Sequence, residues 1–345
     1  MVEEPLRISV VVPAWNSERF LPEALASIAR QHRRPMEVIV VDDASDDATA
    51  ALAESAGARV IRQAWNGGPG ASRNAGIEAA AGDLVAFLDA DDWWQPDHLE
   101  RVAPLLEATP GAVLACGRVR GRMAAEDREL PDTEAPFSAI RMLWRRNPVL
   151  QSAAIVRRSA ILEAGGYRPE MRFAEDYDLW FRLARRGPFV CSSMATVNYR
   201  AHPDQLSARK AAMLKAAWDT RNRAWAQVAP TLDSAERALI EADLRAAWEE
   251  DLRTAWHFRG PEPLSAVMAI EVAVPGIEEI RHRWIAQARW LRAPWLVMAR
   301  CWDRLPAGFR DSIRRARHDH RFPDSGSWQA ADSTLALERA KRGDA

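Results

Sequence analysis

Two clusters of carboxylates stand directly after apolar runs in the first hundred residues. Asp42-Asp43 follows the run Met36–Val41, and Asp89-Ala90-Asp91-Asp92 follows Leu84–Leu88. Clustered carboxylates repel one another and raise one another's pKa unless a cation lies between them. Mg²⁺ or Mn²⁺, bound by one or two carboxylates together with a diphosphate, is a common solution to this repulsion. The pattern therefore predicts a site for a divalent metal and a phosphate-bearing ligand.

Each cluster also has a purely structural interpretation. Taken alone, Asp42-Asp43 could equally well cap a helix that begins near Asp46. The three carboxylates of Asp89–Asp92 are harder to explain as surface residues, because they stand between an apolar run and Trp93-Trp94. The second cluster is therefore the stronger indication of chemistry.

The elements that must position these residues are short β-rich runs that alternate with helical patterns. Strands are expected at Ile8–Val12, Met36–Val41, Ala58–Ile61, Leu84–Leu88 and Ala112–Cys116, and helices at Glu18–Arg30, Asp46–Ala56, Gly70–Ala81 and Pro96–Ala108. Continuous Val/Ile/Leu runs are typical of parallel strands covered on both faces. The βαβα order predicts an α/β fold with a doubly wound, mostly parallel sheet, whose ligands bind beyond the carboxyl ends of the strands. Both acidic clusters should therefore share one cleft.

The remainder of the chain divides near residue 208. A charged loop is expected at Arg118–Glu134, then a strand at Ala153–Val156, a helix at Glu175–Arg186 and a strand at Phe189–Tyr199. Later residues show helical stripes, such as Leu214, Trp218, Trp225 and Val228, or Ile240, Leu244, Trp248 and Leu252, or Ile277, Ile280, Trp284, Leu291, Trp295 and Trp302. We expect a catalytic domain at 1–208, an all-α extension at 209–325 and a flexible tail at 326–345.

Several segments, in order and at matching spacings, resemble family 2 glycosyltransferases, which are inverting enzymes with the GT-A fold. The segments are Val10–Asn16, Val40–Asp46, Gly70–Gly76, Leu88–Asp92, Glu175–Trp180 and Tyr199–His202. The resemblance covers roughly residues 7 to 207. It implies a Rossmann-like catalytic domain that binds a nucleotide sugar, with UDP as the first choice of nucleotide.

The resemblance assigns the donor-binding and metal-binding positions. Pro13, Ala14, Trp15 and Asn16 would line the nucleotide pocket, Asp43 (or Asp42 in its place) would bind the base, Arg73 would lie near the nucleotide, and Asp89 and Ala90 would approach the ribose or sugar. Asp91 would bind Mn²⁺ or Mg²⁺. His202 would either help to hold the metal and diphosphate or cap the loop before Pro203.

The resemblance also assigns the base that inversion requires, a carboxylate that takes a proton from the acceptor hydroxyl. Asp176 matches this position, and Glu175 is the alternative. An ordinary acidic first turn of a helix would look the same without the upstream motifs. Asp178 is two residues further, about 200° around the helix, and should face elsewhere.

The charge distribution suggests a partner for the extension. The net charge is −1, yet residues 281–321 hold eleven arginines and three aspartates, and nine of the 15 tryptophans follow residue 205. Such helices could pack on the catalytic domain, pair with another subunit, or lie on an anionic membrane surface. No nucleic-acid-binding module surrounds the basic segment, so we expect no nucleic-acid partner.

Other classes of protein do not fit the sequence. A hydrophobic share of 48% and a charged share of 28% exclude a disordered or collagen-like chain. The three cysteines, Cys116, Cys191 and Cys301, are odd in number and widely spaced, which is typical of unpaired thiols in a reducing cytoplasm. The acidic start and the lack of an apolar run of about 18 residues argue against a signal peptide and a membrane span. We expect a cytoplasmic protein, or one held peripherally on the inner face of the cell membrane.

Together these patterns predict a metal-dependent inverting glycosyltransferase that adds one sugar to a glycan or lipid-linked acceptor in surface polysaccharide assembly. The alternative is a non-catalytic partner that binds nucleotide sugar or glycan in an assembly complex, and missing motif carboxylates would favour it. A nucleotidyltransferase would need a Gly-rich basic loop where this chain has Pro13–Asn16. The loop Asn66–Gly70 matches neither a P-loop nor a dinucleotide fingerprint.

Overall fold

The computed structural model describes residues 4–120, 130–131, 134–257, 277 and 280. Its contacts divide the chain into two compact units. The first unit contains the residues up to 209 together with 219–230, and the second contains 210–218 together with residues after 230. The candidate site residues all belong to the first unit.

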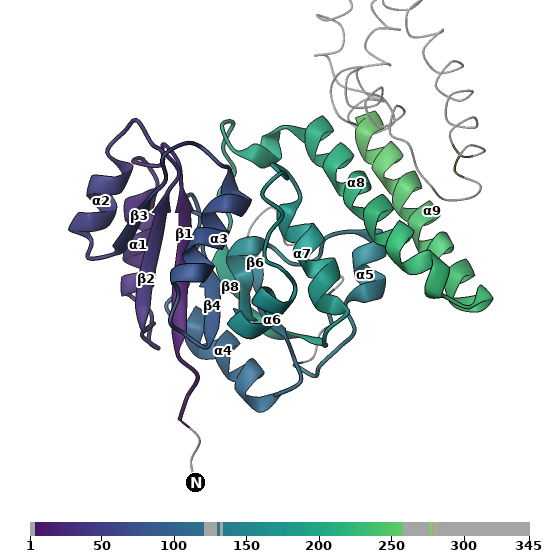
Figure 1. The fold of residues 1–345 in the computed structure, drawn as a ribbon, viewed down its shortest axis with the longest axis horizontal. Coiled ribbons are helices and arrows are strands. Elements are labelled where there is room, and N and C mark those ends of the chain that lie inside the picture. The colour runs from purple at the N-terminus through teal and green to yellow at the C-terminus, as the bar shows by residue number, and fades with distance from the viewer. Residues whose placement is uncertain (1–3, 121–129, 132–133, 258–276, 278–279, 281–345) are drawn as a thin grey trace, which may run out of the picture. The chain divides into compact units, whose positions relative to one another are not determined.

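The first unit is built on a mixed sheet of eight strands in the order β3-β2-β1-β4-β7-β6-β8-β5 (Figure 1). The strands are β1 Ile8–Ala14, β2 Glu37–Asp42, β3 Arg59–Arg62, β4 Leu84–Phe87, β5 Trp93–Trp94, β6 Leu114–Arg120, β7 Ala154–Arg157 and β8 Phe189–Asn198. Four of the seven strand pairings are parallel, and the pairings of β7 with β4 and β6 and of β5 with β8 are antiparallel. The predicted doubly wound, mostly parallel α/β sheet is confirmed.

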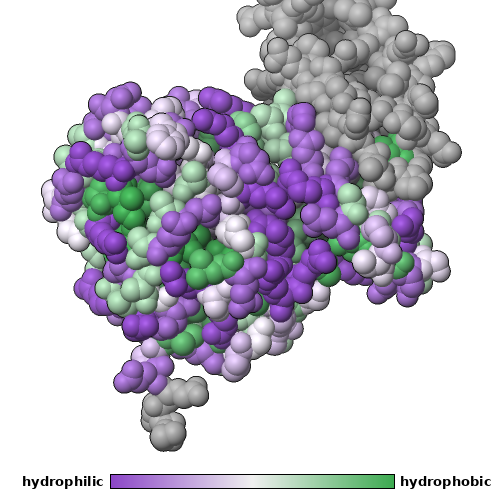
Figure 2. Space-filling model, in the orientation of Figure 1, coloured by the Kyte–Doolittle hydropathy of each residue, from purple (hydrophilic) through white to green (hydrophobic). Residues whose placement is uncertain are grey.

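Helices connect the strands, as the alternating pattern predicts. They are α1 Leu21–Ala29, α2 Thr49–Ser55, α3 Pro69–Ala79, α4 His98–Ala108, α5 Ile140–Arg145, α6 Arg158–Glu163, α7 Glu175–Ala184, α8 Lys210–Val228 and α9 Ser234–His257. Short 3₁₀ turns lie at Gln151–Ala153, Leu206–Ala208 and Ala229–Thr231. Hydrophilic side chains cover much of the face drawn in Figure 2, and apolar ones gather there in separate patches.

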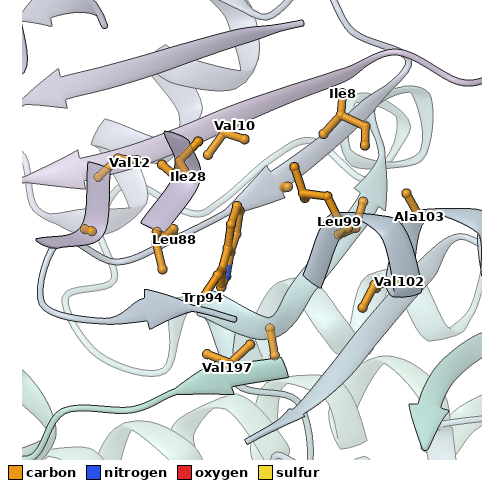
Figure 3. Packing of buried hydrophobic residues seen from close by; sticks show 14 of the residues in the cluster. Ile8, Val10, Val12, Ile28, Leu88, Trp94, Leu99, Val102, Ala103 and Val197 are labelled. Atoms are coloured by element: carbon orange, nitrogen blue, oxygen red, sulfur yellow. The ribbon is translucent and has the colours of Figure 1, made fainter. Parts of the chain in front are cut away.

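Successive side chains of β1 point to opposite faces of the sheet, so β1 contributes to apolar packing on both faces. Val10 and Val12 belong to a buried cluster with Ile28 of α1 and Leu99 of α4 (Figure 3). Val11 points to the other face, where its methyl groups meet Gly76 of α3. Helices therefore cover both faces of the sheet, and the carboxyl ends of its strands are left for ligands.

The structure corrects several predicted boundaries. Strand β6 continues to Arg120, so the predicted loop at Arg118–Glu134 begins too early. Helix α2 begins at Thr49 and not near Asp46, because the Asp47 carboxylate accepts the backbone N–H and the hydroxyl of Thr49. Helices α5 and α6 and the two-residue strand β5 were not predicted, because each is too short to show a clear period.

The tryptophan stripe of α8 divides between the two units. Within the second unit, Trp218 lies edge-on to Trp248 of α9, with ring centroids 4.9 Å apart. Within the first unit, Trp225 lies edge-on to Trp144 of α5, with ring centroids 6.1 Å apart. Both stripes predicted between residues 210 and 252 are therefore helical and place tryptophans in packed positions.

The most basic predicted stripe lies outside the described residues, apart from Ile277 and Ile280, which are buried. The predicted tail at 326–345 also lies outside them. Within the part of the chain that the structure describes, no helix combines the length and apolar character needed to cross a bilayer.

Candidate active site

The loops that follow β1 and β2 are joined at the carboxyl edge of the sheet. The backbone N–H of Asp43 donates to the carbonyl of Ala14 at 2.8 Å. The side-chain oxygen of Asn16 accepts the N–H of Asp46 at 2.9 Å, and the Asn16 N–H donates to Ser45 Oγ at 2.9 Å. Trp15, next to Pro13-Ala14, is 55% exposed. The segments predicted to line the nucleotide pocket therefore lie side by side.

The paired aspartates at the end of β2 are both buried but have different contacts. Both carboxylate oxygens of Asp43 accept backbone N–H groups, from Gly67 and Gly68, at 2.8 Å each. The Asp42 carboxylate accepts the N–H of Ser45 at 3.2 Å. Gly68 has a φ of +86° and stands immediately before α3, so Asp43 orients the start of that helix.

Helix α3 carries Arg73, which joins two carboxylates from distant parts of the chain. Its guanidinium donates to Asp89 at 2.6 Å and to Glu175 at 2.6 Å, and it lies over the ring of Tyr167. Burial disfavours the charged form of Arg73, but the two carboxylates raise its pKa above the ordinary value. Arg73 thus connects the residue predicted to approach the sugar with the start of α7.

The second acidic cluster is held by residues from the far end of the catalytic region. Asp91 Oδ2 lies 2.9 Å from His202 Nε2. Asp92 accepts the Ser152 hydroxyl at 2.6 Å and the Arg200 N–H at 3.0 Å. Burial, together with the neighbouring carboxylates, raises the pKa of both Asp91 and Asp92. A cation bound beside these carboxylates would relieve their mutual repulsion.

The donor atoms in this cluster fit a divalent metal that also binds phosphate oxygens. Carboxylate ligands suit Mg²⁺ and Mn²⁺, and His202 Nδ1 is buried without a hydrogen-bond partner among the described residues. In that part of the chain, no group of three or more His, Cys, Asp or Glu side chains is already arranged around a metal position. Oxygens from a diphosphate would have to complete the coordination.

Asp176 lies in the first turn of α7, next to Glu175, and is half-buried. Its carboxylate accepts the Asn147 side-chain amide at 2.9 Å and the Tyr177 N–H at 2.7 Å. Burial, followed by the charge of Glu175, raises the pKa of Asp176 to about 7. A carboxyl group with this pKa can take up and release a proton near neutral pH.

Asp178 faces away from Asp176, as the helical geometry predicts. Its carboxylate accepts hydrogen bonds from Arg168, Arg182 and Arg223 at 2.9 to 3.1 Å. The two aspartates on one helix therefore have separate environments, and Asp176 is the one next to the Arg73–Glu175 pair.

A model of the family described as glycosyl transferase family 2 matches residues 9–165. Residues 9–165 therefore form a domain of glycosyltransferase family 2. The uncharacterized glycosyltransferase EpsJ of Bacillus subtilis is 36% identical over 222 residues, which cover 58% of this chain and 62% of EpsJ. An uncharacterized glycosyltransferase of Haemophilus influenzae is 28% identical over 187 residues, which cover 53% of this chain and 64% of that protein. This chain thus spans less than two thirds of the length of either relative.

Solved structures of glycosyltransferases share the fold. The mannosyltransferase PcManGT of Pyrobaculum calidifontis, in complex with GDP-Man and Mn²⁺, aligns with a TM-score of 0.54 at 19% identity, over 77% of this chain and 79% of that one. Residues 1–349 of S. aureus TarS, in complex with UDP-GlcNAc, align with a TM-score of 0.50 at 18% identity, over 76% of this chain and 89% of that one. These alignments support a GT-A-like fold for this chain.

Other contacts around the candidate site were not foreseen from the sequence. They come from residues that hold the predicted site residues in place, namely Asn147, Gln151, Ser152, Tyr167 and Arg200. Arg200 stands within the segment Tyr199–His202, which carries part of the family resemblance, and Tyr167 directly follows the glycine pair Gly165-Gly166. Asn147, Gln151 and Ser152 carry no local signal, because each acts on a residue at least 16 positions away.

Proposed function

We propose that the chain is a metal-dependent inverting glycosyltransferase that moves one sugar from a nucleotide sugar to a glycan or lipid-linked acceptor. The observation that carries this proposal is the half-buried carboxyl of Asp176, which Asn147 holds in place and whose pKa lies near 7. Its neighbour Glu175 is joined through Arg73 to Asp89, so the proposed base side and donor side are one connected site. Surface polysaccharide assembly is the proposed setting.

Inverting transfer needs one displacement at the anomeric carbon. The acceptor oxygen forms a bond to that carbon as the bond to the diphosphate oxygen breaks, and the nucleoside diphosphate leaves. The Asp176 carboxylate takes the proton of the acceptor hydroxyl, and Asn147 and the Tyr177 N–H hold the carboxylate in one orientation. Because the pKa of Asp176 is near 7, a large share of the carboxyl is ionised at neutral pH and still basic.

The donor side is proposed to bind the nucleotide through the two joined loops. Pro13–Asn16 would contact the base, and Asp43 or Asp42 would accept its N–H. Asp91, with His202, would hold Mn²⁺ or Mg²⁺, which neutralises the charge of the leaving diphosphate when bound. We propose UDP as the nucleotide. TarS was solved with UDP-GlcNAc and PcManGT with GDP-Man and Mn²⁺. A nucleotide sugar is therefore common to both structures, and the Mn²⁺ of PcManGT supports a divalent metal in this proposal.

The test is the thermal stability of the full chain with a panel of UDP-, GDP- and dTDP-sugars, with and without Mn²⁺. A true donor should raise the melting temperature only when the metal is present, because binding to the folded state stabilises it. Asp91→Ala should lose this stabilisation and sugar transfer. The control Glu78→Ala removes an exposed carboxylate of α3 and should keep both.

Two results would contradict the proposal. One is a donor that stabilises the protein equally in EDTA, and the other is an Asp91→Ala variant with unchanged transfer. Donor binding without transfer to any glycan or lipid-linked acceptor would favour a binding partner in place of an enzyme.

A further inference from the structure

A cleft separate from the candidate active site lies on the face of α7 that carries Asp178. Its lining residues come from α5, α7, the segment around Arg168 and the α8 residues from Thr220 onward, all within the first unit. About 20 Å³ of it is open to a water-sized group, which is room for one or two waters or a small polar group. The surface over α6 and α7 in Figure 2 is mainly hydrophilic.

The cleft holds an excess of positive charge. Four arginines line it, namely Arg168, Arg182, Arg185 and Arg223, and Asp178 is the single carboxylate among its described lining residues. Asp178 already accepts hydrogen bonds from three of these arginines. Since a carboxylate has about four acceptor positions, it leaves most of the guanidinium N–H groups to other partners.

Two further observations are consistent with a site for a negative group. Burial is the main cause that lowers the pKa of Arg182, and the charge of Arg168 acts in the same direction, while Asp178 opposes both. The hydroxyl of Thr220, which is 1% exposed, has no hydrogen-bond partner among the described residues. A buried hydroxyl is usually hydrogen-bonded, so this one lacks an acceptor that an anion would provide.

We propose that this cleft binds a phosphate group through its arginines and the Thr220 hydroxyl. Guanidinium groups match phosphate oxygens with paired N–H donors, and a dianion balances the excess charge better than a single carboxylate would. The small volume admits only one or two of the phosphate oxygens, so the rest of the group, and any molecule attached to it, would extend into solvent. The proposal does not depend on the glycosyltransferase activity, because Asp176 faces the other side of α7.

The first experiment titrates the full chain with inorganic phosphate at constant ionic strength and follows binding by calorimetry. Arg185→Gln removes an exposed lining arginine, and we expect phosphate affinity to fall roughly fivefold or more. Arg186→Gln removes the adjacent exposed arginine, which does not line the cleft, and should leave the affinity nearly unchanged. Absence of binding to the unmodified chain, or equal losses in both variants, would overturn the proposal.

Thr220→Val provides a test that separates binding from folding. Because its hydroxyl is buried without a partner, the variant should melt at the same or a higher temperature in phosphate-free buffer, yet gain less from added phosphate. A lower melting temperature together with an unchanged phosphate effect would contradict the proposed contact.

A third arm identifies the source of the phosphate. Phosphatidic acid vesicles that bind the chain through Arg185, and that inorganic phosphate displaces, would identify a lipid phosphate. Binding of inorganic phosphate without Arg185-dependent binding to these vesicles would identify a free or small-molecule phosphate. Either result supports the site, and failure of both ligands contradicts it.

Discussion

At the scale of single residues, Asp176 combines a cost to stability with a proposed role in catalysis. Its pKa is about 7 in the folded chain, against an ordinary value of 3.8. Between these two values the folded chain binds more protons at this group than the unfolded chain does, so its contribution to stability falls as pH rises. Above pH 7 the folded protein must hold Asp176 as a poorly hydrated carboxylate. The ionised carboxylate is the form that a general base needs.

Asp176→Asn should therefore stabilise the protein at high pH and inactivate it. We expect its melting temperature to exceed that of the unmodified chain at about pH 8, with the difference becoming small near pH 3, where the carboxyl is largely protonated in both the folded and the unfolded chain. Sugar transfer should fall by about 10²- to 10⁴-fold, the usual contribution of a general base. The melting curves and transfer rates at both pH values check this. An equal difference in melting temperature at both pH values would show that ionisation is not the cause.

Asn147 provides a second prediction at this scale. Its amide donates to the Asp176 carboxylate and lowers the pKa of that group. Asn147→Ala removes this stabilisation of the charged form, so the rise of transfer rate with pH should shift to a higher pH. The pH–rate profile checks the direction, and a shift to lower pH would contradict the assigned contact.

At the scale of elements, the position of α3 decides where Arg73 lies. The helix packs closely on β1 at Gly76, where an added Cβ would lie 2.4 Å from a methyl carbon of Val11. Asp43 fixes the other end of this arrangement by binding the N–H groups of Gly67 and Gly68. The close contact and the bound loop together keep Arg73 at the edge of the sheet.

Gly76→Ala should destabilise the fold by about 1–3 kcal/mol, since the extra methyl must push α3 away from β1. Gly111→Ala is the matched control, because no heavy atom lies within 4 Å of its added Cβ. Urea unfolding of both variants measures the free energy of unfolding. Equal values for the two variants would contradict the close packing of α3 on β1.

At the scale of the whole catalytic unit, Arg73 connects segments that are far apart in the chain. Glu175 is 102 residues from Arg73, and Asp89 is 16 residues from it. Both Arg73 and Glu175 are buried away from water, so the charge of each is stabilised mainly by the other. Because the charge of Arg73 also lowers the pKa of Asp176, this one side chain affects the proposed base as well.

Arg73→Met should cost about 3–5 kcal/mol of stability, since it leaves buried carboxylates without their cation. Arg62→Met, which breaks an exposed pair with Glu54, should cost less than about 1 kcal/mol. Adding Glu175→Gln to Arg73→Met should recover part of the loss, because one uncompensated charge is removed. Denaturant unfolding checks all three variants, and similar losses for Arg73→Met and Arg62→Met would contradict the buried link.

The sequence by itself determined the sheet, its order of elements and the acidic edge. Apolar runs such as Ile8–Val12 and Leu84–Leu88 predict buried strands locally, and Asp42-Asp43 and Asp89–Asp92 follow such strands directly. Short elements such as α5 and α6 escaped prediction because one or two turns show no reliable period.

Only the tertiary structure decided which charges meet. It brought Arg73 between Asp89 and Glu175, set Asn147 against Asp176, and gathered four arginines around Asp178. The physical reason is that periodicity and strand ends are encoded over a few neighbouring residues. The pKa of a buried carboxyl, in contrast, depends on desolvation and on charges that packing brings from distant segments.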